Sequence, residues 1–346
     1  MTATPFWPAE WAPQDGVLIA WPHHGTDWSA NLADVEASYS QLVAAIARRQ
    51  DLLVCVADAD IERRMHERLA EAAVDTSRVR VARIDYDDTW LRDSGPITLL
   101  ADAGPVLLDF RFTGWGGKFE AGRDDRLIAG LIDREAFAPG VRHRPVDFAL
   151  EGGAVETDGE GTLLSTWHCL AMRHPGLDRA AVERRLAGAL AVDRFLWLDH
   201  GALSGDDTDA HIDTLARFAA VDRIVYQACD DPDDDHHEPL AAMAAELAAF
   251  RTRAGAAYQL YPLPWPRPIH HRDGRRLAAS YANFLIINDA VLMPGYGDPA
   301  DADAAGVLAR AFPGRSIEIV PCRPLIEQNG SLHCLTMQLP RGVLNR

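Results

Sequence analysis

The sequence lacks long apolar runs and a surplus of positive charge. None of its hydrophobic stretches approaches the roughly 20 residues that a membrane-spanning helix requires. The first residues, MTATPFWPAEWAPQDG, do not contain a basic segment followed by an apolar core, so we expect no secretory signal and a cytoplasmic location. The net charge of −17 argues against nucleic-acid binding, which depends on Lys and Arg, and is compatible with a cationic substrate.

The chain also lacks cysteine patterns typical of disulfide frameworks and zinc ribbons. It has five cysteines, an odd number, and no CxxC pair: Cys55, Cys169, Cys229, Cys322 and Cys334. We therefore expect reduced thiols. For Cys55, Cys169, Cys229 and Cys322 the expected role is that of a small buried hydrophobic residue.

Recognisable metal and phosphate motifs are missing as well. The three His-His pairs (23–24, 236–237 and 270–271) have no HExxH spacing, and adjacent residues of a strand point in opposite directions. GWGGK (114–118) does not have the spacing of a phosphate-binding loop, and its glycines are expected to shape a turn that carries Trp115. DTDAHID (207–213) lacks the glycine of an EF-hand loop. We therefore expect a surface or packing role for the His-His pairs, and neither a phosphate loop at 114–118 nor a calcium loop at 207–213.

What the sequence does contain is an alternation of short apolar runs with alanine-rich amphipathic stretches. Strands are predicted at 16–21, 52–57, 105–112, 162–167, 194–198, 223–228, 283–289 and 316–320, and helices at 31–50, 61–73, 183–191, 239–254 and 302–312. This pattern indicates an α/β protein without the two halves of a Rossmann enzyme. We expect a single domain over residues 1–346, built from several related units.

Charged side chains stand next to several of these apolar elements. TWLRDSGP (89–96) contains Trp90 and Asp93, and LEGGAVETDGEG (150–161) contains Glu151. In DTDAHIDTLARF, His211 and Asp213 are two residues apart, which places them on one side of an extended segment. Each alone could be a helix cap, a turn acid or a surface charge. Together with Cys334 in NGSLHCLTMQLP (329–340) they would supply an acidic pocket, an imidazole and a thiol.

Such a set suits the chemistry of a guanidine. Paired carboxylates complement the donors of a planar guanidinium ion, a thiolate can add to its central carbon, and an imidazole can protonate departing ammonia. Nearby carboxylates raise the pKa of a thiol, so the charge of the substrate or a protonated His211 must favour the thiolate. Strand alternation would place Cys334 and His333 on opposite faces, which leaves His211 as the expected base.

The chain resembles the agmatine deiminases, also called the bacterial peptidyl-arginine-deiminase-like family. The resemblance runs nearly end to end and rests on PAEW (8–11), LIAWPH (18–23), DDTWLRDSGP (87–96), GWGGK, EGGAVETDGEGTLLST (151–166), DDTDAHID (206–213), ASYANFLIINDAVLMPGYGDPAD (279–301), FPGR (312–315) and NGSLHCLTMQ (329–338). It implies a pentein fold, a five-bladed α/β propeller of ββαβ units around a central pocket. It also implies conversion of agmatine and water to N-carbamoylputrescine and ammonia.

The resemblance also implies roles for individual residues. Cys334 would be the nucleophile that forms a covalent amidino-thioether, and His211 the general acid and base, with Glu151 as its partner. The substrate-binding residues would be Asp93 and Asp213 at the guanidinium, Asp207 as a further acid, and Trp90 and Trp115 as walls. The resemblance also implies that no cofactor or metal is needed and that the protein is a homo-oligomer, while its charge and lack of long apolar runs lead us to expect neither nucleic acid nor membrane as a partner.

Other activities fit the same residues. Free or peptidyl arginine could replace agmatine, an amine could replace water in amidinotransfer, and a non-catalytic guanidine- or polyamine-binding protein is a further alternative. The chain departs from the family where Gln328 and Asn329 replace part of a glycine-rich loop, where Ala210 replaces a glycine and where Met337 replaces a glutamine. We expect the Gln328-Asn329 departure to bear on the end of the substrate that lies away from the guanidine.

Overall fold

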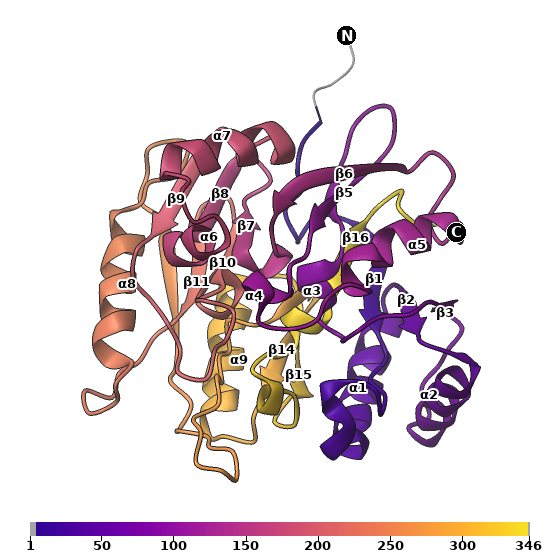
Figure 1. The fold of residues 1–346 in the computed structure, drawn as a ribbon. Coiled ribbons are helices and arrows are strands. Elements are labelled where there is room, and N and C mark those ends of the chain that lie inside the picture. The colour runs from indigo at the N-terminus through magenta and orange to yellow at the C-terminus, as the bar shows by residue number, and fades with distance from the viewer. Residues whose placement is uncertain (1–4, 345–346) are drawn as a thin grey trace.

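The strands of this computed structural model, which describes residues 5–344, form five small sheets (Figure 1). The first sheet contains β1 (Gln14–Ala20), β2 (Asp51–Val56), β3 (Val79–Arg83) and β16 (Met337–Pro340). The others contain β4 (Ile97–Leu99), β5 (Val106–Arg111) and β6 (Arg142–Ala149); β7 (Val155–Thr157), β8 (Thr162–Thr166) and β9 (Arg194–Leu198); β10 (Ala216–Ala220), β11 (Arg223–Gln227) and β12 (Gln259–Leu263); and β13 (Leu285–Ile287), β14 (Ala290–Gly295) and β15 (Ser316–Pro321).

All five sheets share one topology. A short first strand pairs antiparallel with the second strand, which pairs parallel with a third, as β4, β5 and β6 do. Because parallel neighbours need a crossover, a helix lies between the second and third strands of each unit. The repeat that the sequence only suggested is therefore present as five ββαβ units, as predicted.

The two ends of the described chain close the ring of units. β16 pairs antiparallel with β1, with Val17 opposite Gln338, and so serves as the first strand of the first unit. In Figure 1 the yellow C-terminal strand lies beside the indigo β1. The first sheet gains its fourth strand, β3, because α2 adds another crossover after β2.

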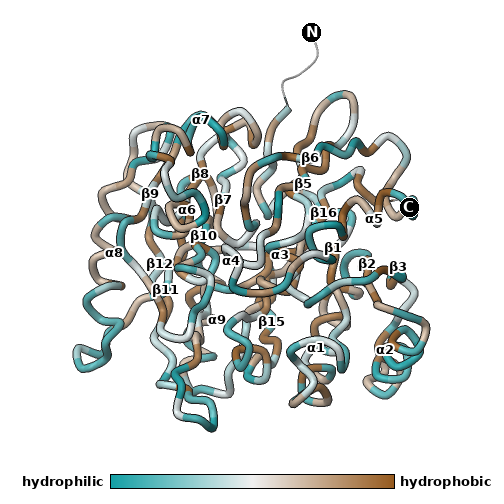
Figure 2. Tube along the Cα trace, viewed as in Figure 1, coloured by the Kyte–Doolittle hydropathy of each residue, from teal (hydrophilic) through white to brown (hydrophobic). Residues whose placement is uncertain are grey.

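The longer helices surround the sheets (Figure 1). They are α1 (Leu32–Ala47), α2 (Ala59–Glu71), α5 (Leu127–Asp133), α6 (Trp167–Arg173), α7 (Arg179–Leu190), α8 (His237–Ala249) and α9 (Ala300–Ala311). In Figure 2 the strands are mostly brown and the outer helices carry teal turns, as expected of amphipathic helices. On α1 the buried side chains include Val35, Tyr39 and Leu42, which lie on one face at helical spacing. Within residues 5–344, no helix has both the length and the hydropathy for a membrane span.

A short turn just before the first strand of each unit carries polar side chains toward the centre of the ring of units. These turns are α3 (Leu91–Ser94) before β4, η3 (Gly152–Ala154) before β7, η4 (Ile212–Thr214) before β10, residues 280–283 before β13, and η6 (His333–Leu335) before β16. α3 contacts both η3 and η6, and η3 contacts η4. Each unit thus contributes its equivalent turn to one central site.

Two local predictions were wrong. Residues 332–337 do not form one continuous strand, because η6 covers His333–Leu335 and β16 begins only at Met337. The amide of Thr336 donates to the carbonyl of His333, a local bond that competes with strand pairing. Likewise, His211 and Asp213 are not on an extended segment, since Asp213 lies in the turn η4. Both side chains nevertheless reach the same site, as described below.

Candidate active site

A cavity of about 320 Å³ opens over the turns that precede the first strands. Cys334 and Asp93 lie among its lining residues, and the rings of Trp90 and Trp115 form part of its wall. Asp207 also lines it. This volume suits a small molecule.

Cys334 is buried on η6 and faces an amide and a carboxylate. Asn283 Nδ2 lies 3.2 Å from Cys334 Sγ, and Asp213 Oδ2 lies 3.6 Å from it. Burial, followed by Asp213 and Asp93, raises the pKa of the Cys334 thiol well above its usual value. In the absence of a cation, the thiol form is therefore favoured.

Asp93 is fixed by two donors. The indole Nε1 of Trp115 donates to Asp93 Oδ2 at 2.9 Å, and the backbone amide of Gly153 donates to Oδ1 at 3.0 Å. A Cβ at Gly153 would lie 2.7 Å from His211 Nδ1 and 2.8 Å from Asp93 Oδ1, so a side chain does not fit there. Trp115 itself has a left-handed backbone (φ 55°) between Gly114 and Gly116, which confirms the predicted glycine turn.

The same oxygen of Asp213, Oδ2, lies near the Cys334 thiol and contacts His333. His333 Nδ1 lies 2.8 Å from Asp213 Oδ2, and His333 Nε2 lies 2.8 Å from Glu10 Oε2. Among the described residues, Asp213 Oδ1 is buried without a hydrogen-bond partner. Burial alone would raise the pKa of Asp213, but the bond to His333 and the nearby charges lower it, so the carboxylate stays ionised.

His211 stands between two carboxylates. Its Nδ1 lies 3.6 Å from Asp93 Oδ1, and its Nε2 lies 3.7 Å from Glu151 Oε2. Arg173 Nε donates to the other oxygen of Glu151 at 2.7 Å. All four side chains are buried. Burial alone would lower the pKa of His211, but Asp93, Cys169 and Glu151 raise it well above its usual value, which favours the imidazolium.

The loop before Cys334 reaches the far wall of the cavity. Asn329 has a left-handed backbone (φ 70°), and its Nδ2 donates to Asp207 Oδ2 at 2.8 Å. Gly330 packs so closely on Trp90 that a Cβ would lie 2.3 Å from the ring. Ala210, which also replaces a family glycine, is left-handed too (φ 67°). Both substitutions therefore preserve a backbone shape that glycine adopts more readily.

The structure brings together all eight predicted site residues and adds four that the sequence reasoning missed. The additions are Asn283, beside the thiol; His333, beside Asp213; Glu10, beside His333; and Cys169, behind His211. Glu10 lies in PAEW and Asn283 in ASYANF, two segments that carried the family resemblance, but neither has a pattern that reveals its partner. The three His-His pairs do not enter any potential metal-binding cluster among residues 5–344.

Asp93 and the thiol of Cys334 line the cavity, and Asp213 Oδ2 lies 3.6 Å from that thiol, so the three groups suit a planar cation. The thiol of Cys334 can attack the carbon of that cation. His211 lies next to Asp93, so its imidazole can exchange protons with a cation that Asp93 holds. These features define an amidine hydrolase of the pentein fold.

The chain belongs to the family described as Porphyromonas-type peptidyl-arginine deiminase, whose model matches residues 6–340. It is 35% identical to the agmatine deiminase of Stutzerimonas stutzeri over 98% of both chains, and 34% identical to that of Pseudomonas aeruginosa over 96% of this chain and 95% of the relative. It is thus an agmatine deiminase-type enzyme that hydrolyses guanidines.

Solved structures similar to this chain support the family assignment. A Cys-to-Ser variant of C. jejuni agmatine deiminase with substrate bound has a TM-score of 0.90 at 33% identity, over 99% of this chain and 98% of that one. A candidate arginine deiminase from Porphyromonas gingivalis has a TM-score of 0.92 at 45% identity, over 99% and 100% of the two chains. At 13% identity, an amidinotransferase from Microseira wollei shares only the fold, with a TM-score of 0.52 over 98% of both chains.

Proposed function

We propose that this enzyme converts agmatine and water to N-carbamoylputrescine and ammonia through a covalent intermediate on Cys334. Asp93 and Asp213 hold the guanidinium ion in this proposal. Its positive charge offsets the two carboxylates that disfavour the thiolate, so substrate binding promotes ionisation of Cys334.

The first half of the reaction forms a C–S bond and breaks a C–N bond. The thiolate of Cys334 adds to the guanidinium carbon, and His211 donates its proton to the departing nitrogen, which leaves as ammonia. The product of this half is a cationic amidino-thioether. Asp93 and Asp213 stabilise positive charge at the reacting carbon throughout, which an oxyanion hole would not do.

The second half replaces sulfur with oxygen. Water attacks the thioether carbon while His211, now neutral, accepts a proton from it. The hydroxyl of the tetrahedral intermediate then gives its remaining proton to the departing sulfur as the C–S bond breaks, so Cys334 returns to the thiol and His211 keeps the proton that it took from water. The carbon retains the new oxygen as a ureido carbonyl, and the proton released when Cys334 ionised converts ammonia to ammonium, so the atoms and charges balance.

The choice of agmatine rests on the charge of the outer cavity. Beyond the reacting carbon the cavity is lined by Asp27, Asp87, Asp88, Glu120 and Asp124, and none of its lining residues within 5–344 is Lys, Arg or His. Burial raises the pKa of both Asp88 and Asp124 to about 7, and a second cation nearby would favour their ionised forms. Agmatine carries an amine at that end, whereas free arginine also carries a carboxylate that these acids would repel.

The test is ammonia release from agmatine, free arginine, an arginine peptide and butylguanidine, which is agmatine without its amine. We expect kcat/KM to be highest for agmatine and to fall by about 10- to 100-fold for butylguanidine, since one charge-assisted contact contributes about 1.5–3 kcal/mol. Mass spectrometry of the product should find N-carbamoylputrescine. Preference for arginine over agmatine would refute the substrate assignment and leave the chemistry of Cys334 unaffected.

A further inference from the structure

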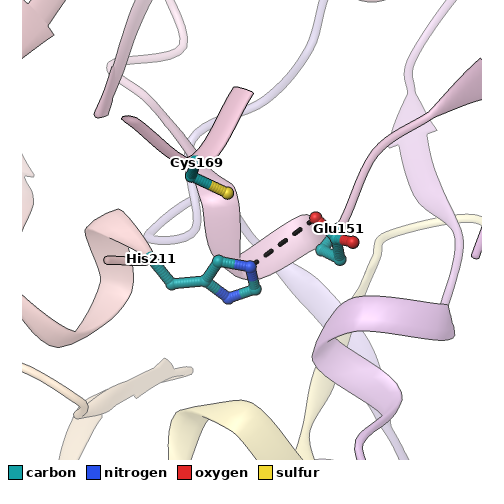
Figure 3. Close-up of side chains that lie close together, drawn as sticks. All are labelled: Glu151, Cys169 and His211. Atoms are coloured by element: carbon teal, nitrogen blue, oxygen red, sulfur yellow. Dashed lines mark ion pairs between the residues drawn. The ribbon is translucent and has the colours of Figure 1, made fainter. Parts of the chain in front are cut away.

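Behind His211, on the side away from Asp93, lies a second group of reactive side chains that the proposed mechanism does not fully use. Cys169 projects from α6 toward the ring of His211, and Glu151 approaches the same edge of that ring (Figure 3). Donor atoms of Glu151, Cys169 and His211 all lie within 4.8 Å of one another, and all three residues are buried.

Two of these donor atoms have no hydrogen-bond partner in the part of the chain that the structure describes. They are Glu151 Oε2 and His211 Nε2, which are 3.7 Å apart, too far for a hydrogen bond. Buried polar atoms are nearly always satisfied, so two such atoms left open side by side mark a place where a bound group would satisfy both.

The donor set is one that a thiophilic cation prefers. Zn²⁺ binds thiolate sulfur at about 2.3 Å and imidazole or carboxylate donors at about 2.0–2.2 Å, so neighbouring ligands of a tetrahedral ion lie about 3.3–3.7 Å apart. The observed 3.7 Å between His211 Nε2 and Glu151 Oε2 already matches that spacing. Arg173 holds the opposite oxygen of Glu151 at 2.7 Å and thereby directs Oε2 toward the group.

We propose that Glu151 Oε2, Cys169 Sγ and His211 Nε2 form a binding site for a thiophilic divalent cation such as Zn²⁺, and that its occupation inhibits the enzyme. Binding replaces two protons, one from the Cys169 thiol and one from Nε2 of the His211 imidazolium. A 2+ ion thus takes the place of two positive charges, so the net buried charge does not change.

Inhibition follows from the protonation state that the bound ion imposes on His211. With Nε2 bound to the metal and a proton on Nδ1, the ring has no lone pair to accept a proton from water. Donation from Nδ1 would produce an imidazolate, which is far less favourable than donation from an imidazolium. This consequence rests on the proposed role of His211, whereas binding of the ion does not.

Binding can therefore be tested without turnover, with Co²⁺ as a spectroscopic substitute for Zn²⁺. We expect one Co²⁺ per chain and a thiolate-to-cobalt charge-transfer band in the near ultraviolet. The band should disappear in Cys169→Ser and Cys169→Ala, and persist in Cys334→Ser and in Cys55→Ser, which removes another buried thiol. Circular dichroism and thermal unfolding of each variant establish that it is folded.

Activity provides the second measurement. The concentration of Zn²⁺ that halves turnover should rise at least about tenfold in Cys169→Ser relative to Cys55→Ser. Absence of Co²⁺ binding, a band that survives in both Cys169 variants, or a band lost in Cys334→Ser would overturn the proposed site. If Co²⁺ bound as expected but Zn²⁺ did not inhibit, the inhibition would be refuted, and with it the role assigned to His211.

Discussion

Two networks of buried charged residues meet at Asp213. They differ in how many of their polar atoms have hydrogen-bond partners. Behind the site, the guanidinium of Arg217 bonds Glu10, Glu156 and the carbonyl of Phe284. Around the cavity, by contrast, both ring nitrogens of His211 and one oxygen of Asp213 have no hydrogen-bond partner among residues 5–344.

The contrast indicates a division of labour. A charge whose donors and acceptors are satisfied cannot move cheaply, and such a network fixes the positions of its neighbours. Unsatisfied buried atoms are costly in the free protein, and they gain partners when a ligand arrives. Asp213 belongs to both networks, since its Oδ2 is bonded to His333 and lies 3.6 Å from Cys334 Sγ, while its Oδ1 has no partner among residues 5–344. Each prediction below removes a member of one network and measures which property changes.

The largest effect on kcat is expected at the reactive face, by which we mean the residues around the cavity. Cys334→Ala should lower kcat by at least about a thousandfold, because no other group can form the thioether, while the midpoint of thermal unfolding changes little. Cys55→Ala, which removes a buried thiol that does not line the cavity, should leave kcat near that of the wild type. Near-normal turnover by Cys334→Ala would refute covalent catalysis.

The supporting network should show the reverse pattern, with stability as the main loss. Arg217→Met leaves Glu10 and Glu156 buried without their shared cation and should lower the free energy of unfolding by about 3–5 kcal/mol. Arg63→Met is the control, because Arg63 and its partner Asp60 are exposed and such pairs contribute about 0–1 kcal/mol. Urea denaturation measures both. Equal losses in the two variants would contradict the distinction between the networks.

The polar residues of the reactive face could be predicted because each stands at the boundary of an apolar run. Asp93, Glu151 and Asp213 stood out as charged residues beside apolar or glycine-rich segments, although the strands that follow them, β4, β7 and β10, were not predicted. Cys334 was found with them through its surrounding segment, although its local structure was predicted as strand. The supporting network could not be predicted, because Glu10 and Arg217 are 207 positions apart and their pairing depends on the fold.

Two further features could not be found from residue patterns, for different reasons. The five units were expected only from the family resemblance, because β4, β7 and β13 have only three residues each, too few for a recognisable alternation. Cys169 was treated as a buried hydrophobic residue, and by burial it is one; only the fold reveals that His211 lies beside it. A buried thiol next to an ionisable partner looks in sequence like any other buried thiol.

An intermediate effect is expected where the two networks join. His333→Gln removes one of the two contacts that the imidazole makes, and kcat/KM should fall by about 10- to 100-fold as Asp213 loses its fixed orientation. His333 also lowers the pKa of Asp213, which must be ionised to hold a guanidinium. Without that contact burial raises the pKa of Asp213, so the acid limb of the kcat/KM profile should move to higher pH.

The matched control for this variant is His143→Gln. His143 forms a comparable pair with Asp109, at 2.7 Å, but neither residue lines the cavity. The acid limb of the kcat/KM profile of His143→Gln should coincide with that of the wild type. If the profile of His333→Gln had a normal acid limb and only a reduced stability, His333 would be a structural residue and not a positioning one.

The smallest effect is expected at the rim, where the chain departs from its relatives. Asn329→Gly keeps the left-handed backbone but loses the 2.8 Å bond to Asp207 and the 2.6 Å bond that Arg275 donates to Asn329 Oδ1. We expect kcat/KM for agmatine to fall by only about two- to fivefold, because Asp207 loses a donor but remains in the wall. Asp289→Gly is the control: it has the same type of backbone (φ 61°) and does not line the cavity. A fall of more than about a hundredfold in Asn329→Gly alone would mean that Asn329 contacts the substrate directly, and that the rim determines substrate choice more strongly than its acidic charge does.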